Sequence, residues 1–264
     1  MTTSPMKKNN VRFAFFGMPP LAEGVLEELA LAGFKPERVI ETNDISSELL
    51  EELRKDPVDV FIVASFGKIL PKELIDIPKL GTLNMHPSLL PRLRGASPMR
   101  SAILNDEKET GVSIMLMDEQ MDHGPLLAQK KVAIDPWPPR GKDMDSLLAH
   151  EGGKLLAKVL PLWIAGELET QEQNHDLATY TEKFTKENGL LDLDADAYQN
   201  LLKVRAFEGW PGTYAFFERS GKKIRVQILD AHLESNKLVI DLVKPEGKKE
   251  MRYGEFLNSG AKPA

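Results

Sequence analysis

An amide, an imidazole and a carboxylate occur in this sequence at positions where they could act together on one carbonyl group. Asn84 and His86 lie two positions apart at the end of an apolar run, and Pro87 follows directly. In an extended chain residues i and i+2 point to the same side, so the amide and the imidazole should face one cleft. Pro87 cannot donate a ladder hydrogen bond and is expected to end the strand. Asp122, shortly before Gly124 in a predicted turn, is the carboxylate that we expect to complete the group.

This combination suits acyl transfer directly to an external amine, because no nucleophilic side chain accompanies it. An Asn can donate to a developing oxyanion, and losing one such donor typically costs about 100- to 1000-fold in rate. A His can polarise the carbonyl or move a proton, and a nearby Asp can orient or charge that His. Taken singly the residues are weak signals, since a His before Pro is more often structural and an Asp-X-Gly is usually a turn.

The elements that must position these residues alternate between strands and helices. We expect strands at 11–16, 38–41, 58–64 and 81–85, and helices at 19–32 and 43–55. This alternation of strands and helices predicts an α/β fold of Rossmann type, with a parallel-containing sheet, helices on both faces and right-handed crossovers. Ligands of such sheets bind at the carboxyl ends of the strands. The loops after Phe16, Ala64 and Met85 are therefore predicted to form the functional rim.

The remainder of the chain predicts a second, smaller domain. Further elements are expected as two strands within 111–134, helices at 142–165 and 195–206, and short strands at 213–217, 223–229 and 238–243. The Gly, Ser and Asn turns between the last three strands indicate a small β-barrel-like, OB-like domain. The predicted organisation is a disordered N-terminus at 1–10, a catalytic domain at 11–166, a linker at 167–189 and the β-rich domain at 190–264.

Composition limits the classes of function. A chain of 264 residues with 42% hydrophobic and 28% charged residues is typical of a globular protein. Its apolar runs have the length of strands, so we expect no membrane association. The absence of Cys excludes disulfide scaffolds and Cys nucleophiles and fits a reducing compartment, the cytoplasm or an organellar matrix. The net charge of −6 argues against a broad phosphate-binding surface but leaves room for a local basic patch.

Several segments together resemble the signatures of the folate-dependent formyltransferase family. These segments are residues 16–19, 66–71, 84–98 and 111–124. Each is weak alone, and their joint occurrence is specific. The resemblance implies 10-formyltetrahydrofolate as co-substrate, no metal, no covalent enzyme intermediate, and a catalytic set of Asn84, His86 and Asp122. It further implies a folate pocket that is formed by Phe66, Gly67, Ile69, Leu70, Ser88, Leu89, Leu90 and Pro91.

The second half resembles the branch of this family that formylates methionyl-tRNA. The similar segments are residues 180–183, 204–207, 210–211, 244–249 and 256–258. This implies methionyl-tRNA as the amine acceptor of a protein that we expect to be a monomer. Four basic residues could contact its phosphates or simply form a solvated face: Lys183, Lys186, Lys203 and Arg205.

Three departures from that branch keep other functions open. A long basic loop is missing before Asn43, Met18-Pro19-Pro20 replaces the usual Thr-Pro-Asp, and the C-terminal barrel is shorter. The first alternative is an N-formyltransferase that acts on an amino-sugar nucleotide. The second is a catalytically silent folate- or tRNA-binding protein.

Overall fold

Two units share the chain, and each has its own sheet. The structure is a computed structural model that describes residues 11–42 and 44–264. The first unit comprises the described residues up to Pro98 together with Glu109–Ala133 and Asp145–Thr181. The second comprises Met99–Lys108, Ile134–Met144 and Glu182–Ala264. The segment at 1–10, for which we expect disorder, lies outside the described residues.

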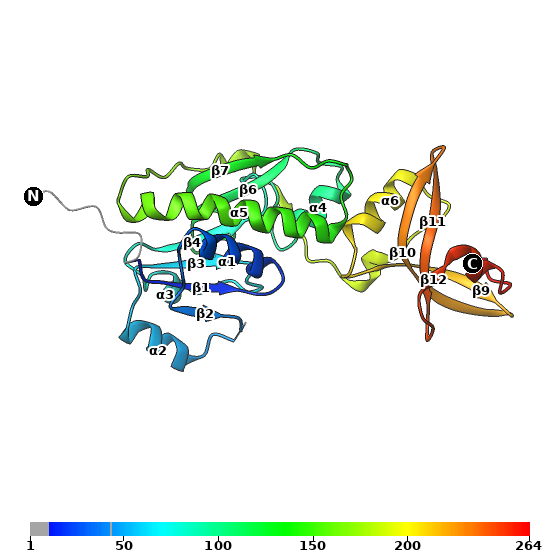
Figure 1. The fold of residues 1–264 in the computed structure, drawn as a ribbon, viewed down its shortest axis with the longest axis horizontal. Helices are drawn as coiled ribbons and strands as arrows, with labels where there is room; N and C mark the ends of the chain where they lie inside the picture. Colours follow the sequence, from blue (N-terminus) through cyan, green and yellow to red (C-terminus); the bar gives the residue numbers. More distant parts are fainter. Residues whose placement is uncertain (1–10, 43) are drawn as a thin grey trace, which may run out of the picture. The chain divides into compact units, whose positions relative to one another are not determined.

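A six-stranded mixed sheet lies at the centre of the first unit (Figure 1). Its strands are β1 (Phe13–Gly17), β2 (Arg38–Ile40), β3 (Val60–Ala64), β4 (Thr82–His86), β6 (Thr110–Leu116) and β7 (Leu126–Val132). Their spatial order is β2-β1-β3-β4-β6-β7. The first four strands are parallel, whereas β6 pairs antiparallel with β4 and β7 with β6. All residues of β1 and β3 are buried, as expected for strands that are covered on both faces.

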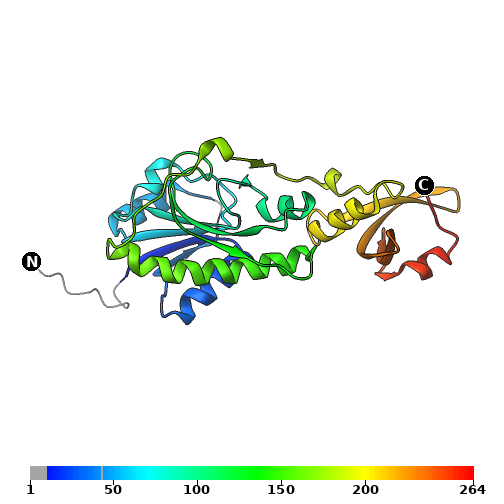
Figure 2. The same cartoon turned by 90° about the horizontal axis from the view of Figure 1, so that it is seen from above.

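Helices cover both faces of this sheet, so the predicted Rossmann-type α/β fold is confirmed. They are α1 (Leu21–Leu31), α2 (Ser47–Lys55), α3 (Lys72–Ile75) and α5 (Gly141–Ile164), and α5 runs lengthwise beside the strands (Figure 2), whereas nearly all of α4 (Pro98–Leu104) belongs to the second unit. On one face, residues of α2 and α3 form one apolar cluster with Phe16 and Phe61. On the other, α5 packs closely on β4 at Gly152 and on α1 at Gly153. No helix among residues 11–42 and 44–264 has the length and hydropathy that crossing a bilayer requires.

Helix α2 begins later than its sequence pattern predicts. The predicted start is Asn43, which lies outside the described residues, and the observed first residue is Ser47. Ser46 precedes the helix in an extended conformation, and its hydroxyl accepts a hydrogen bond from the Leu49 amide at 3.2 Å. Such a cap satisfies an amide that has no partner inside the helix.

Much of the predicted linker is bound to the first unit. Gln171 exchanges two backbone hydrogen bonds with Leu126, at 2.7 and 2.8 Å. After a 3-10 turn at His175–Leu177, strand β8 (Tyr180–Thr181) pairs in parallel with β5 (Arg94–Gly95). Residues 167–181 therefore belong to the first unit, and the division between units differs from our expected boundary at 166. Backbone pairing between such distant segments leaves no local pattern in the sequence.

The second unit contains the predicted β-rich domain, built around a five-stranded antiparallel sheet. Its elements are a 3-10 turn at Lys186–Gly189, α6 (Ala197–Ala206), β9 (Thr213–Arg219), β10 (Lys222–Glu234), β11 (Lys237–Pro245), β12 (Met251–Arg252), α7 (Tyr253–Leu257) and β13 (Lys262–Pro263). The sheet order is β12-β11-β10-β9-β13. Two-residue turns at Ser220-Gly221 and Ser235-Asn236 join β9 to β10 and β10 to β11, and all four residues have positive φ. Positive φ at both central residues is the geometry that fits the twist of a hairpin.

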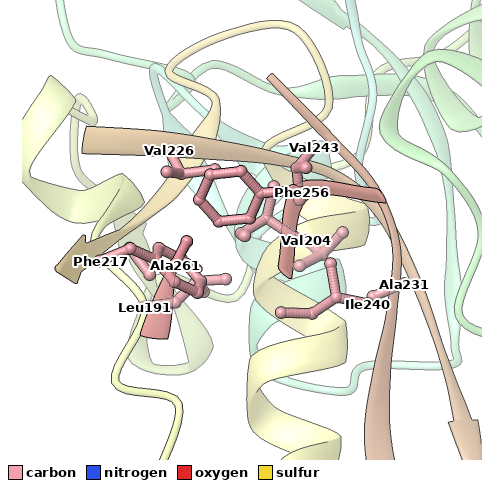
Figure 3. Close-up of a cluster of buried hydrophobic side chains, with 11 residues drawn as sticks. Leu191, Val204, Phe217, Val226, Ala231, Ile240, Val243, Phe256 and Ala261 are labelled. Carbon is pink, nitrogen blue, oxygen red and sulfur yellow. The ribbon is translucent and has the colours of Figure 1, made fainter. Parts of the chain in front are cut away.

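A separate apolar core holds the second unit together (Figure 3). Phe217 of β9 and Phe256 of α7 meet edge to face, with ring centroids 5.2 Å apart. Val226 and Val243, from the paired strands β10 and β11, are fully buried in the same cluster. Because every buried member lies between Leu191 and Ala261, this core is made from the C-terminal part of the chain alone.

Candidate active site

The three residues with the predicted chemistry meet at one carboxylate. The Asn84 side-chain amide donates to Asp122 Oδ1 at 3.3 Å. The Nδ1 atom of His86 lies 3.5 Å from the same oxygen. Asn84 and His86 share one side of β4, as their spacing predicts, and Asp122 comes from the loop between β6 and β7. The structure therefore brings together all three residues that the sequence analysis predicts as a catalytic set.

The loop that carries Asp122 is held in an unusual conformation. Asp122 has a φ of 49°, in the left-handed region that most residues avoid. Its second carboxylate oxygen accepts a hydrogen bond from the Gly95 amide at 2.7 Å. Two residues on, a Cβ atom at Gly124 would lie 2.0 Å from the Leu116 carbonyl oxygen, so only glycine fits there. The position of the carboxylate thus depends on backbone groups from two distant segments.

The hydrogen bonds of His86 define which nitrogen carries a proton. Its imidazole is buried, and Nε2 lies 3.0 Å from the Leu93 carbonyl oxygen. A carbonyl oxygen can only accept, so Nε2 must be the donor. The Nδ1 atom then faces Asp122, and this contact is favourable when a proton lies between nitrogen and carboxylate. The imidazole and the carboxylate thus lie side by side at the site.

Two further buried residues, Arg94 and Gln173, lie beside the site, and the sequence analysis assigns no role to either. The Arg94 guanidinium, 1% exposed, donates to Gln173 Oε1 at 2.7 Å and to the Tyr180 hydroxyl at 3.3 Å. Gln173 in turn donates to the backbone carbonyls of Asp122 and Gly124, at 3.0 and 2.7 Å. Arg94 lies inside a segment that carries the family resemblance and could have been suspected. Gln173 lies in a polar stretch whose sequence has no comparable signal.

The two segments of the predicted folate pocket follow neighbouring parallel strands, β3 and β4. In the first, Ile69 is 68% exposed, whereas Leu70 is buried in the cluster that includes Phe16 and Phe61. In the second, Leu90 is buried against Met115. These two leucines support their loops from within the protein. The exposed or half-buried members of the predicted set are Phe66, Gly67, Ile69, Leu89 and Pro91.

Hydrogen bonds inside the protein hold the second of these segments. The Ser88 hydroxyl donates to the Arg92 carbonyl at 2.7 Å, and the Ser113 hydroxyl donates to the Ser88 carbonyl at 2.6 Å. Gln129 donates to the Leu90 carbonyl at 2.8 Å. The Ser88 side chain is thus engaged within its own loop. Folate binding by the eight residues stays a prediction.

Family models match both halves of the chain. The model for formyl transferases matches residues 26–160, and that for the formyl transferase C-terminal domain matches residues 183–238. The first match spans Asn84, His86 and Asp122.

Relatives with similar sequences extend over most of the chain. The methionyl-tRNA formyltransferase of Citrifermentans bemidjiense is 35% identical over 263 aligned positions, which cover 91% of this chain and 79% of the relative. That of Dictyoglomus turgidum is 37% identical, with 81% and 75% covered.

Solved structures share the fold at lower identity. The methionyl-tRNA formyltransferase from Clostridium thermocellum has a TM-score of 0.69 at 17% identity, covering 89% of this chain and 98% of that one. A sugar N-formyltransferase from Shewanella sp. has 0.65 at 19%, with 85% and 99% covered. HypX from Aquifex aeolicus in complex with tetrahydrofolic acid has 0.71 at 18%, with 94% and 47% covered. On the strength of the family models and the sequence relatives, this chain belongs to the formyl transferase family and is a formyltransferase.

Proposed function

We propose that this formyltransferase moves the formyl group of 10-formyltetrahydrofolate to the α-amino group of methionyl-tRNA. The observation that carries the proposal is the convergence of Asn84 and His86 on the Asp122 carboxylate. It is supported by relatives at 35% and 37% identity that are methionyl-tRNA formyltransferases and that match most of this chain.

Asn84 is suited to stabilise negative charge on the transferred carbonyl. Its amide nitrogen carries two hydrogens, so one can donate to Asp122 while the other donates to a developing oxyanion. Because Asp122 fixes the orientation of the amide, little reorganisation is needed when the charge develops.

His86 and Asp122 are suited to receive the proton of the attacking amine. An α-amino group has a pKa of about 7.7–8, so much of it must lose a proton near neutral pH before or during attack. The carboxylate, or the imidazole beside it, can accept that proton. The His86 Nε2 atom is engaged by Leu93, so we assign the imidazole to proton transfer and charge, and the direct oxyanion contact to Asn84.

The loops near Asn84, His86 and Asp122 lie at a place in the fold that suits a folate co-substrate. The segments at 66–71 and 87–91 follow two adjacent parallel strands, at the edge of the sheet where α/β proteins bind ligands. We propose that the exposed or half-buried residues of these segments contact the folate. When bound, 10-formyltetrahydrofolate supplies an activated formyl group for direct transfer.

A second acceptor is favoured by one specific observation. Six residues, 41–46, separate β2 from α2, since β2 ends at Ile40 and α2 begins at Ser47. This connection is too short for the long basic loop that we expect of a methionyl-tRNA enzyme. An amino-sugar nucleotide, which needs no such loop, is therefore the alternative acceptor.

Two of the four basic residues that could contact tRNA phosphates instead make contacts within the second unit. The Lys203 ammonium donates to the Leu190 carbonyl at 2.7 Å. Arg205 lies 3.5 Å from the Asp230 carboxylate and donates to the Ala231 carbonyl. Of the four basic residues, Lys183 and Lys186 are exposed. These four residues therefore support a tRNA acceptor less strongly than the sequence relatives do.

An acceptor assay tests the proposal directly. The purified protein is incubated with labelled 10-formyltetrahydrofolate and, in parallel, with methionyl-tRNA or a panel of amino-sugar nucleotides. We expect formylation of methionyl-tRNA. Turnover of an amino-sugar nucleotide alone would establish the alternative.

The catalytic set is tested by two substitutions. We expect His86→Ala and Asp122→Asn each to lower kcat by at least about 100-fold, because each removes a group that moves the proton or fixes the amide. Circular dichroism and thermal unfolding check that the variants fold. Near-native kcat in both folded variants would refute the assigned chemistry.

A further inference from the structure

Gln173 uses both hydrogens of its side-chain amide on the loop that carries Asp122. The side chain is buried, at 5% exposure. Its Nε2 atom donates to the backbone carbonyl of Asp122 at 3.0 Å and to that of Gly124 at 2.7 Å. Gln173 comes from the segment between α5 and β8, about 50 residues further along the chain.

The same side chain also reaches the segment that binds the Asp122 carboxylate. Its Oε1 atom accepts a hydrogen bond from the Arg94 guanidinium at 2.7 Å. The next residue, Gly95, donates its backbone amide to Asp122 Oδ2 at 2.7 Å. Gln173 therefore connects the backbone of the Asp122 loop to the segment that holds the Asp122 side chain.

The hydrogen bonds from Gln173 matter because Asp122 has an unfavourable backbone conformation. A left-handed φ of 49° is uncommon at residues other than glycine. Residues in such regions persist only when surrounding contacts enforce them. The two hydrogen bonds from Gln173 act on the carbonyls of Asp122 and Gly124, on either side of His123.

We propose that Gln173 is a positioning residue for formyl transfer, which fixes the Asp122 carboxylate relative to Asn84 and His86. This inference rests on the proposed role of Asp122. Among the described residues, Gln173 makes no hydrogen bond to the side chain of Asn84, His86 or Asp122, so it acts through backbone geometry. Small errors in the placement of a reacting group cost much of the rate while leaving substrate binding largely intact.

Two substitutions at Gln173 separate positioning from support of the fold. In Gln173→Glu the carboxylate can still pair with Arg94, but it cannot donate to the two carbonyl oxygens. Gln173→Met has a similar shape and removes all three hydrogen bonds. Asn200→Leu is the matched control, because Asn200 is also 5% exposed and its amide donates to one backbone carbonyl, that of Asp192, in the second unit.

The variants are compared with the wild type and Asp122→Asn, using an acceptor that the wild type formylates. We expect both Gln173 variants to lower kcat by about 10- to 100-fold, with KM for both substrates close to the wild-type values. The Gly95 amide resonance in a ¹H–¹⁵N spectrum should move in both, because its bond to Asp122 changes. Asn200→Leu should lower stability but leave kcat and this resonance unchanged.

Folded Gln173→Glu with wild-type kcat and an unmoved Gly95 resonance would overturn the inference. It would also be overturned if Asn200→Leu lowered kcat as much as the Gln173 variants, since the cause would then be a general loss of stability. Wild-type activity in Asp122→Asn would instead refute the proposed catalytic role of Asp122.

Discussion

At the scale of single residues, Asp122 is held through atoms of both its side chain and its backbone. Its carboxylate receives the Asn84 amide on one oxygen and the Gly95 amide on the other, and its carbonyl receives Gln173. The three donors belong to segments that are far apart in the sequence. A carboxylate with so many fixed donors can be placed to within the small tolerance that transfer chemistry needs.

Gly124 provides a test of this placement. A methyl group at this position would lie 2.0 Å from the Leu116 carbonyl oxygen, a backbone atom that cannot move aside by rotating. We expect Gly124→Ala to lower the free energy of unfolding by about 1–3 kcal/mol, the usual range for overpacking. Because the loop must shift, kcat should also fall. Urea unfolding and the formylation assay measure the two effects.

Gly254→Ala is the control for that substitution. Nothing lies within 4 Å of a Cβ atom at Gly254, in the short helix α7. This variant should keep the stability and kcat of the wild type. Equal behaviour of the two alanine variants would show that the Asp122 loop tolerates movement.

The sequence predicts part of this site because part of it depends on local geometry. Asn84 and His86 share a face through their spacing on one strand, which any extended chain imposes. Gly95 lies in a strand of residues 94–95 that pairs with residues 180–181, and Gln173 lies in the segment before the second of these strands. That pairing joins two-residue strands with no hydrophobic alternation, so no periodic pattern reveals it.

At the scale of elements, strands β10 and β11 carry an ion pair that responds to pH. The His232 Nδ1 atom lies 2.8 Å from the Asp241 carboxylate on the neighbouring strand. This hydrogen bond raises the pKa of His232 above its ordinary value. A raised folded-state pKa means that the pair's stabilisation is fully present below the unfolded-state pKa and is lost as the pH rises through the folded-state value.

We therefore expect the free energy of unfolding of the wild type to fall from about pH 6 to about pH 8.5, the range around the ordinary His pKa. In His232→Gln this fall should be smaller. Both side chains are about half exposed, so solvent screening keeps the effect small. Urea unfolding at the two pH values measures it in the wild type and the variant. Lys237→Gln, in the same hairpin, should retain the wild-type pH dependence. An unchanged pH dependence in His232→Gln would mean that the pair adds no stability.

Long apolar runs predict most of the strands, whereas the shortest elements have no recognisable sequence pattern. The runs at 11–16 and 58–64 correspond to β1 and β3, whose residues are all buried. Strand β10 extends five residues beyond the predicted 223–229, past an irregularity in its pairing near Asp230. Helices such as α3 and α7 span only four and five residues, too few for an amphipathic period to stand out.

At the scale of the whole molecule, each of the two units has an apolar cluster of its own. One cluster of the first unit is made of residues between Ala14 and Ile75, whereas the cluster in Figure 3 lies entirely between Leu191 and Ala261. Neither cluster includes a side chain of the other unit. Since burial of apolar surface is the dominant favourable term in folding, we expect each unit to lose its structure largely on its own.

Phe256→Ala tests this independence. Phe256 is 1% exposed and contacts Phe217 edge to face, so its removal should leave a cavity that costs about 3–5 kcal/mol. Hydrogen exchange read by mass spectrometry should then be faster in β9, β10 and β11, while β1 and β3 keep their protection. The neighbouring Leu257→Ala, at a side chain that is 37% exposed, should change little. Equal loss of protection in β1 and β3 would mean that the two cores unfold as one cooperative unit, because damage to the second would then be transmitted to the first.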